Sequence, residues 1–255
     1  MRKYLPTVLA GTDAALAHII VADNGSSDDS IEVMETLFPQ VKLLKFHKNY
    51  GFAGGYNKAI ELTPGYRYTV LLNSDVRTPQ GWLNPLYQYL EEHPEVGAVQ
   101  PKLLHDRDDG KRMFEYAGAA GGFIDKHGYP YCRGRMFEAV EDDHGQYDGK
   151  DIDIFWATGA CLMIRSELYK NVGGLDEDFF AHMEEIDLCW RIHLSGSEVR
   201  IVTASEVFHL VGGTTVQLSL ARYFILSRAN VHCSSSSRML VIQSAMVEAE
   251  AMLSL

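Results

Sequence analysis

Asn73, Ser74 and Asp75 follow an apolar run and form the first cluster whose residue types could do chemistry. Positions i and i+2 of a strand point to one face, so Asn73 and Asp75 share a side. A hard divalent cation that bridges a diphosphate needs only one or two protein carboxylates, because phosphate oxygens and water complete its octahedron. Asp75 is therefore a candidate cation ligand, although these three residue types also favour an ordinary turn.

Glu184, Glu185 and Asp187 form a second cluster, at the start of a predicted helix. A carboxylate beside a hydroxyl nucleophile can act as a general base, and neighbouring carboxylates raise its pKa. Acidic residues also suit the positive end of a helix dipole, so a solvated helix start is the alternative interpretation. His209 ends a short predicted strand and could be a ligand of the same cation, or a hydrogen-bonded structural histidine.

Residues that could bind a nucleotide lie earlier in the chain. Asp23 ends the first apolar run and could accept a hydrogen bond from the imide N–H of uracil or thymine, or could simply cap a turn. The glycine-rich segment 49–57 could bring backbone N–H groups close to phosphate at a helix N-terminus, although it lacks the G-x-G-x-x-G spacing. Residues 156–160 could line an acceptor pocket, with Trp156 stacking on a sugar, or could begin a core strand.

The candidate residues must be positioned by the secondary structure around them. In the sequence, short apolar runs alternate with amphipathic segments. Strands are predicted over 17–22, 41–46, 68–72 and 96–100. Helices are predicted over 29–38, from the glycine turn 51–55 to 62, and over 79–92. This alternation predicts an α/β fold with a mostly parallel, Rossmann-like sheet and flanking helices, in which ligands bind beyond the carboxyl ends of the strands.

The second half of the chain is less regular. Residues 106–149 are rich in glycine, aspartate and aromatic residues and are expected to form an irregular excursion with short hairpins and no helix. Further strands are predicted over 152–157, 199–203 and 206–209, and helices over 166–174 and 183–194. A serine run at 234–237 precedes 238–255, which is a candidate amphipathic helix.

Composition limits the classes of function. The chain has 255 residues, 46% of them hydrophobic, and a net charge of −11, which argues against nucleic-acid binding because that needs a basic face. The four cysteines are widely spaced and no run of 18 apolar residues occurs. We therefore expect a reduced, cytoplasmic protein, and leave open a peripheral association with the inner face of the membrane.

Several motifs, taken together and in order, are more specific than any one of them. They are VADNGSSDDS (21–30), NYGFAGGYNKAI (49–60), LLNSDVRTPQGWL (71–83), ATGACLMIRSELYKNVGGLDEDFFAHMEEIDLCWR (157–191) and VFHLVGGTT (207–215). In this order the chain, from about residue 17 to 215, resembles the family 2 glycosyltransferases of glycosyltransferase-A fold, in particular the rhamnosyltransferase-like branch.

The resemblance implies a role for each cluster. Asp75 stands at the second acidic position of the family's Asp-x-Asp metal motif, where Asn73 replaces the first, and His209 resembles the histidine that completes a Mn²⁺ or Mg²⁺ site. Glu185 stands where the family has its catalytic base, usually Asp, with Glu184 and Asp187 as the next candidates.

The remaining site residues are implied contacts of the two substrates. The donor contacts are Asp23, Asn24, Gly51, Gly54, Asn57, Asn73 and Asp75. The acceptor contacts are Trp156, Gly159 and Ala160. The implied reaction is an inverting single displacement from a nucleoside-diphosphate sugar to a hydroxyl of a glycan or lipid-linked saccharide, with rhamnose from a thymidine diphosphate donor as the branch's suggestion.

The two ends of the chain depart from the family pattern. RKYLPTVLA, at 2–10, resembles the helix after the family's first strand, so that strand is expected to be missing between 17–22 and 68–72. We therefore expect an N-terminally truncated catalytic domain over 1–215 and a helical tail over 216–255, with marginal stability and poor donor binding. The alternatives are a nucleotidyltransferase, which would call for a basic phosphate-binding loop that is not visible, and a catalytically inactive fragment that binds nucleotide sugar or serves assembly.

Overall fold

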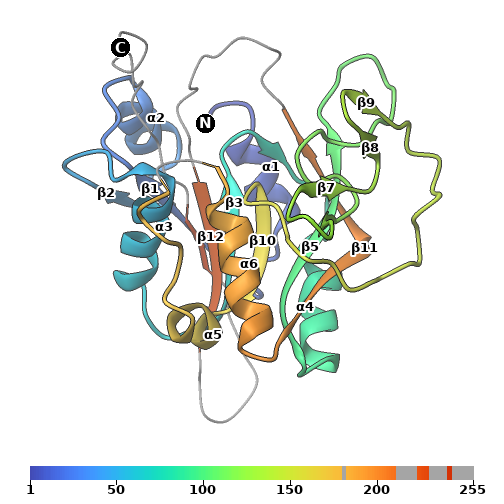
Figure 1. The fold of residues 1–255 in the computed structure, drawn as a ribbon. Coiled ribbons are helices and arrows are strands. Elements are labelled where there is room, and N and C mark those ends of the chain that lie inside the picture. Colours follow the sequence, from blue (N-terminus) through green and yellow to red (C-terminus); the bar gives the residue numbers. More distant parts are fainter. Residues whose placement is uncertain (180–181, 211–222, 230–239, 243–255) are drawn as a thin grey trace, which may run out of the picture.

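A nine-stranded mixed sheet with helices on both faces forms the centre of the protein (Figure 1). The computed structural model describes residues 1–179, 182–210, 223–229 and 240–242. The first strands are β1 (His18–Asp23), β2 (Lys42–Lys45), β3 (Tyr66–Asn73) and β4 (Val76–Arg77). The later strands of this sheet are β5 (Val96–His105), β10 (Cys161–Arg165), β11 (Glu198–His209), β12 (Tyr223–Ala229) and β13 (Leu240–Ile242).

The predicted α/β fold with flanking helices is confirmed, and its sheet is mixed where a mostly parallel sheet was expected. Strands β1 and β2 are parallel, as are β5 and β11. Strand β10 lies between β3 and β5 and is antiparallel to both, and β4 is antiparallel to β11. The reversal follows from the excursion after β5, which brings the chain back into the sheet in the opposite direction. The expected strand over 152–157 makes only isolated bridges, and the regular strand is β10.

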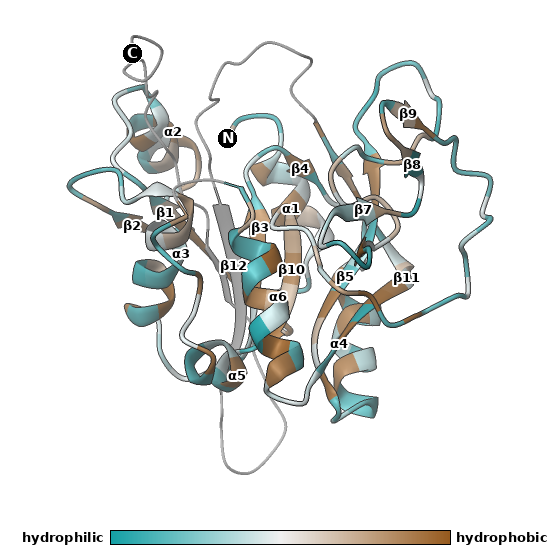
Figure 2. Cartoon of the chain, viewed as in Figure 1, coloured by the Kyte–Doolittle hydropathy of each residue, from teal (hydrophilic) through white to brown (hydrophobic). Residues whose placement is uncertain are grey.

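Side chains that alternate along each strand divide the core into two layers. One layer packs Ile20 and Leu71 against α3 (Gly51–Glu61), α5 (Ser166–Asn171) and α6 (Glu184–Leu194). The other layer packs Val21 and Val70 against α1 (Leu5–Gly11), α2 (Ser30–Leu37) and α4 (Leu83–Glu92). Figure 2 shows the mixed hydropathy of these helices, whose brown residues supply the two layers. None of the described helices is long and apolar enough to cross a membrane.

The place where a first strand was expected to be missing is filled. Strand β12 pairs antiparallel with both β1 and β3, and the short β13 pairs parallel with the same two strands. The described parts of the expected helical tail 216–255 are therefore strands, and the rest of that tail lies outside the described residues. Because backbone groups of β1 and β3 have partners here, the expected cause of marginal stability is absent from the described structure.

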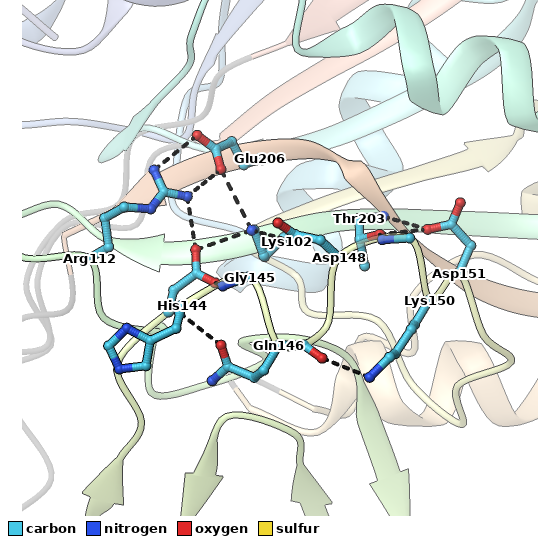
Figure 3. Close-up of polar contacts among 12 residues, drawn as sticks. Lys102, Arg112, His144, Gly145, Gln146, Asp148, Lys150, Asp151, Thr203 and Glu206 are labelled. Atoms are coloured by element: carbon cyan, nitrogen blue, oxygen red, sulfur yellow. Dashed lines mark hydrogen bonds and ion pairs between the residues drawn. The ribbon is translucent and has the colours of Figure 1, made fainter.

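The excursion after β5 contains two hairpins and no helix, as predicted. The hairpins are β6 (Gly122–Ile124) with β7 (Pro130–Cys132), and β8 (Arg135–Met136) with β9 (Ala139–Val140). A network of charges with a buried Lys102–Asp143 pair at its centre attaches the excursion to the sheet (Figure 3). Lys102 Nζ on β5 lies 3.1 Å from Asp143 and 2.7 Å from Asp148, and Arg112 Nη2 bridges Asp143 and Glu206 at 2.8 and 2.7 Å. We call these five residues the anchor network.

Candidate active site

Asp75 and His209 meet at the side of the sheet where β1, β3, β5 and β11 end, which we call the carboxyl edge. Strand β4 follows β3 after a two-residue turn and pairs with the end of β11, so that His209 lies opposite Val76. Asp75 Oδ1 lies 3.1 Å from His209 Nε2, although 134 positions separate the two residues. The two side chains that the motifs assign to one cation therefore lie together in the folded chain.

The spacing of this pair fits a divalent cation. Two neighbouring ligands of an octahedral ion at about 2.0–2.2 Å lie roughly 3 Å apart, close to the separation of Oδ1 and Nε2. One carboxylate and one imidazole suit Mn²⁺ or Mg²⁺ only if phosphate and water supply the other ligands. Among the described residues no group of three or more His, Cys, Asp or Glu side chains could hold a metal, so such a cation would depend on its substrate.

Behind His209 lies Glu115, a residue that sequence reasoning did not identify. Glu115 Oε1 is 3.4 Å from His209 Nδ1, and the Glu115 side chain is 1% exposed. Burial alone would lower the pKa of His209, but Asp75 and Glu115 together raise it to about 10. Glu115 lies in the excursion, where no periodic pattern separates one acidic residue from the many others, so no sequence signal could have found it.

The N-terminus of α6 presents two carboxylates to the interior. Glu184 is 3% exposed and its Oε2 atom has no hydrogen-bond partner in the structure. Burial and the neighbouring Glu185 raise the pKa of Glu184 to about 8, and burial also raises the pKa of Glu185. The two residues before the helix, His182 and Met183, have φ of 74° and 75°, a left-handed conformation that is unusual for side chains of this size.

The loop at 158–160 connects these carboxylates to the strand that leads to Asp75. A Cβ atom on Gly159 would lie 2.9 Å from Phe52 Cζ on α3 and 3.8 Å from Glu185 Cβ on α6. The next residue, Ala160, accepts a hydrogen bond of 3.0 Å from the backbone N–H of Asn73. Two of the predicted acceptor contacts therefore lie between the candidate base and the end of β3.

Two other predicted donor residues carry unpaired oxygens at the same edge. Asp23 ends β1 and is buried, and its Oδ2 accepts the backbone N–H of Ser26 while Oδ1 has no partner. Asn73 ends β3 and its buried Oδ1 also lacks a partner. Buried polar atoms nearly always have partners, so unpaired oxygens at Asp23, Asn73 and Glu184 mark places where a bound molecule or water would complete the hydrogen bonding.

Two other predicted donor contacts, Asn24 and Asn57, serve the fold. Asn24 bonds to Gly51 O at 2.9 Å and accepts the N–H of Tyr50, which joins the end of β1 to α3. Asn57 uses both amide atoms, because Nδ2 donates to Leu175 O and Oδ1 accepts from Tyr169. Asn57 therefore has no free polar atom to offer, and its prediction as a donor contact is not supported by the geometry.

The glycines of 51–55 also differ from the expectation. They form the first turn of α3 and not a turn that precedes it. Gly51 has φ 73°, a conformation that favours glycine. A Cβ on Gly54 would lie 3.4 Å from Glu177 Oε2 and 3.1 Å from Tyr50 Cβ. The absence of a side chain at Gly54 thus allows close packing of α3.

Trp156 and Asp187 also lie in structural roles. Trp156 is buried, its ring covers Gly122 and its Nε1 donates to Phe123 O at 2.9 Å, so it cannot stack on a sugar in this conformation. Asp187 accepts two hydrogen bonds from Arg191, at 2.6 and 2.9 Å, one turn along α6. The candidate bases therefore reduce to Glu184 and Glu185.

Solved structures with a similar fold support the architecture. A crystal structure of GalNAc-T7 with UDP, GalNAc and Mn²⁺ superposes with a TM-score of 0.62 at 15% identity, covering 82% of this chain and 40% of that one. A crystal structure of S. aureus TarS 1–349 superposes with a TM-score of 0.56 at 13% identity, covering 82% of this chain and 56% of that one. The fold is the α/β fold of glycosyltransferase-A enzymes.

Proteins with similar sequences identify the family to which the chain belongs. An N-acetylglucosaminyl-diphospho-decaprenol L-rhamnosyltransferase of Mycobacterium tuberculosis is 24% identical over 82% of this chain and 71% of its own length. Rhamnosyltransferase WbbL of Escherichia coli is 32% identical over 63% of this chain and 61% of its own length. The chain thus spans less than two thirds of WbbL and of both solved structures. The model of glycosyl transferase family 2 matches residues 3–173, more than half of the chain, and the chain belongs to that family.

Proposed function

We propose that this glycosyltransferase moves a sugar from a nucleoside-diphosphate donor to an acceptor hydroxyl with inversion at the anomeric carbon. The observation that carries the proposal is the carboxylate pair at the start of α6, with Glu184 buried and Glu185 half-buried beside Gly159, at the same edge as Asp75 and His209. A single displacement needs one base on the side of the acceptor and stabilisation of the leaving diphosphate on the other side.

Glu185 is the proposed base. Glu185 stands at the base position of the family's motif, whereas burial and Glu185 raise the pKa of Glu184 to about 8, which favours its protonated form at pH 7. As the acceptor oxygen forms its bond to the anomeric carbon, its proton passes to Glu185 and the bond from that carbon to the diphosphate oxygen breaks. Attack from the face opposite the diphosphate inverts the configuration, and no covalent sugar–enzyme intermediate forms.

Asp75 and His209 would hold a divalent cation against the donor diphosphate. A bound cation would supply charge neutralisation for the departing nucleoside diphosphate. Asp23 would use its unpaired Oδ1 to accept a hydrogen bond from the nucleobase, and Asn73 would offer its unpaired Oδ1 to the donor. Each of these roles uses an atom that has no partner, or a pair already spaced for a cation.

We further propose L-rhamnose as the sugar and a lipid-linked saccharide as the acceptor. Two relatives are named as rhamnosyltransferases, and the name of one specifies a diphospho-decaprenol acceptor. A thymidine diphosphate donor fits Asp23, since thymine carries the imide N–H that a carboxylate can accept.

Calorimetry and a donor screen test the proposal together. Binding of thymidine diphosphate and uridine diphosphate is measured with and without Mn²⁺, for the wild type and for Asp75→Ala. We expect binding that needs Mn²⁺ and is lost in the variant. Release of nucleoside diphosphate from a panel of nucleotide sugars then reports turnover. Tight binding without any turnover, even with saccharide acceptors, would favour the inactive binding module.

A further inference from the structure

We infer that Glu115, supplied by the excursion, is a positioning residue that holds His209 in the orientation and tautomer needed at the cation site. The inference rests on the proposed function, since it concerns the same cation. It gives the excursion a part in the active site, although none of its residues was assigned there by sequence.

The excursion is bonded directly to the strands that end at the site. The backbone N–H of Glu115 donates to Leu103 O at 3.0 Å, and Phe114 forms an antiparallel bridge with Leu104 on β5. The N–H of Asp106 donates to His209 O at 2.9 Å. These bonds fix the backbone of Glu115 relative to β5 and the backbone of His209 relative to the start of the excursion.

The carboxylate of Glu115 has two partners, and each takes one oxygen. Oε2 accepts the backbone N–H of Ala117 at 2.7 Å, which sets the direction of the side chain. Oε1 then faces His209 Nδ1 at 3.4 Å, and the opposite ring nitrogen, Nε2, faces Asp75. The imidazole therefore lies between two carboxylates, one buried and one partly exposed.

Among the described residues, the buried carboxylate of Glu115 is paired with His209 and with no other basic side chain. In the part of the chain that the structure describes, the only ion pair of Glu115 is with His209. The nearby cations have other partners, because Arg112 and Lys102 pair with Asp143 and Glu206. A fully buried carboxylate without a cationic partner is costly, so its placement here points to the imidazole.

This arrangement serves a metal ligand in a specific way. A histidine that binds a metal through one ring nitrogen usually donates the N–H of the other nitrogen to a carboxylate or carbonyl, which fixes the ring and its tautomer. Here Glu115 would accept Nδ1–H and leave the lone pair of Nε2 for the cation beside Asp75. The anchor network then supports the cation site indirectly, because its ion pairs hold the segment that carries Glu115 against the sheet (Figure 3).

The first experiment measures Mn²⁺ binding in the presence of saturating thymidine diphosphate, by electron paramagnetic resonance titration of the folded protein. We expect Glu115→Gln to weaken Mn²⁺ binding by roughly 10- to 100-fold, the range seen when such outer partners are removed. Glu141→Gln is the matched control, since Glu141 is an exposed carboxylate of the same excursion that bonds Tyr147 and Gln146, and it should bind Mn²⁺ as the wild type does. Unchanged Mn²⁺ affinity in a folded Glu115→Gln protein would overturn the inference.

A second measurement reads the protonation of His209 in the wild type itself. Nitrogen-15 spectra of the histidine rings in the Mg²⁺-loaded wild type, with His209 assigned by its loss in His209→Ala, report which ring nitrogen carries the proton. We expect His209 protonated on Nδ1, and protonation on Nε2 would contradict the inference. A wild type that binds no Mn²⁺ even in the presence of thymidine diphosphate or uridine diphosphate would instead remove the cation from the proposed function, and with it the reason for Glu115.

Discussion

The anchor network and the carboxyl edge of the sheet differ in how completely their buried polar atoms are paired. In the anchor network Lys102 and Asp143, whose side chains are 3% and 2% exposed, are paired with each other and with further charges. At the edge, Asp23, Asn73 and Glu184 each keep a buried oxygen without a partner. Complete pairing is what a structural cluster needs, whereas unpaired atoms reduce stability and are retained where a ligand binds. The comparison therefore sets a paired structural cluster against an edge that we propose binds substrate.

The largest effect should come from removing the proposed base at the edge. Glu185→Gln keeps the size of the side chain but cannot accept a proton, so turnover should fall by roughly 100-fold or more. Donor affinity, measured by calorimetry, should change little. Near-normal turnover would exclude Glu185 and move the role to Glu184.

Breaking the anchor network should affect stability and not the chemistry directly. Lys102→Met removes the buried cation between Asp143, Asp148 and Glu206, and we expect a loss of about 3 kcal/mol in the free energy of unfolding. Urea denaturation measures the loss. The control is Lys150→Met, because Lys150 is an exposed lysine of the same excursion that donates to Gln146 O, and its change should stay within about 0.5 kcal/mol.

The two regions should also differ in their response to pH. The pKa of Glu184 is raised from 4.5 to about 8, so the folded state binds this proton more tightly than the unfolded state. Its contribution to stability is complete below about pH 4.5 and is lost as the pH rises to 8. Unfolding measured across this range should show a slope that Glu184→Gln reduces.

The contribution of Asp143 to stability should depend on pH in the opposite direction. Burial alone would raise its pKa, but the backbone N–H of Gly145 and the cations Arg112 and Lys102 lower it below 3.8. Its contribution is therefore present above pH 3.8 and is lost as the pH falls below that value. Asp143→Asn should flatten the acid limb of the stability curve and leave the slope between pH 4.5 and 8 unchanged. Equal slopes in both variants would remove the distinction between the two regions.

The smallest effect concerns backbone strain before α6. Met183→Gly should stabilise the chain by about 1 kcal/mol if the left-handed conformation is retained, because glycine adopts it without steric cost. Phe137→Gly is the matched control, at φ 53° in an exposed hairpin. Both should raise the melting temperature, but only Met183→Gly should change turnover, since residue 183 sets the direction of Glu184 and Glu185.

The sequence predicted the elements near the edge better than the order of strands. Strands at β1 and β3 and helices at α2 and α6 come from clear apolar periodicity, and Asp75 and His209 were placed together by their motifs. Periodicity carries no information on strand direction, so the antiparallel insertion of β10 was missed. Trp156 illustrates a second limit, because an aromatic residue in a motif looks the same whether it packs on Gly122 or faces a sugar.

Hydrogen-bond saturation could not be predicted from residue type either. Asn57 and Asn73 are the same amino acid in neighbouring motifs, yet one bonds Leu175 and Tyr169 while the other keeps a free oxygen. The difference arises from residues more than 100 positions away in the sequence. Glu115 was missed for the same reason, since its proposed role depends on its contact with His209, 94 positions away in the sequence.

The position of β12 has a consequence for how the protein is made. Residue 18 pairs with residue 227, and in the described structure β1 is connected to β3 through β12 and β13. Contacts between residues so distant in sequence form slowly, because a long loop must close before any of them is gained. During synthesis on the ribosome, β1 is therefore made about 200 residues before β12, its partner strand. Until β12 is made, the backbone groups of β1 that will pair with it are exposed to pairing with other nascent chains.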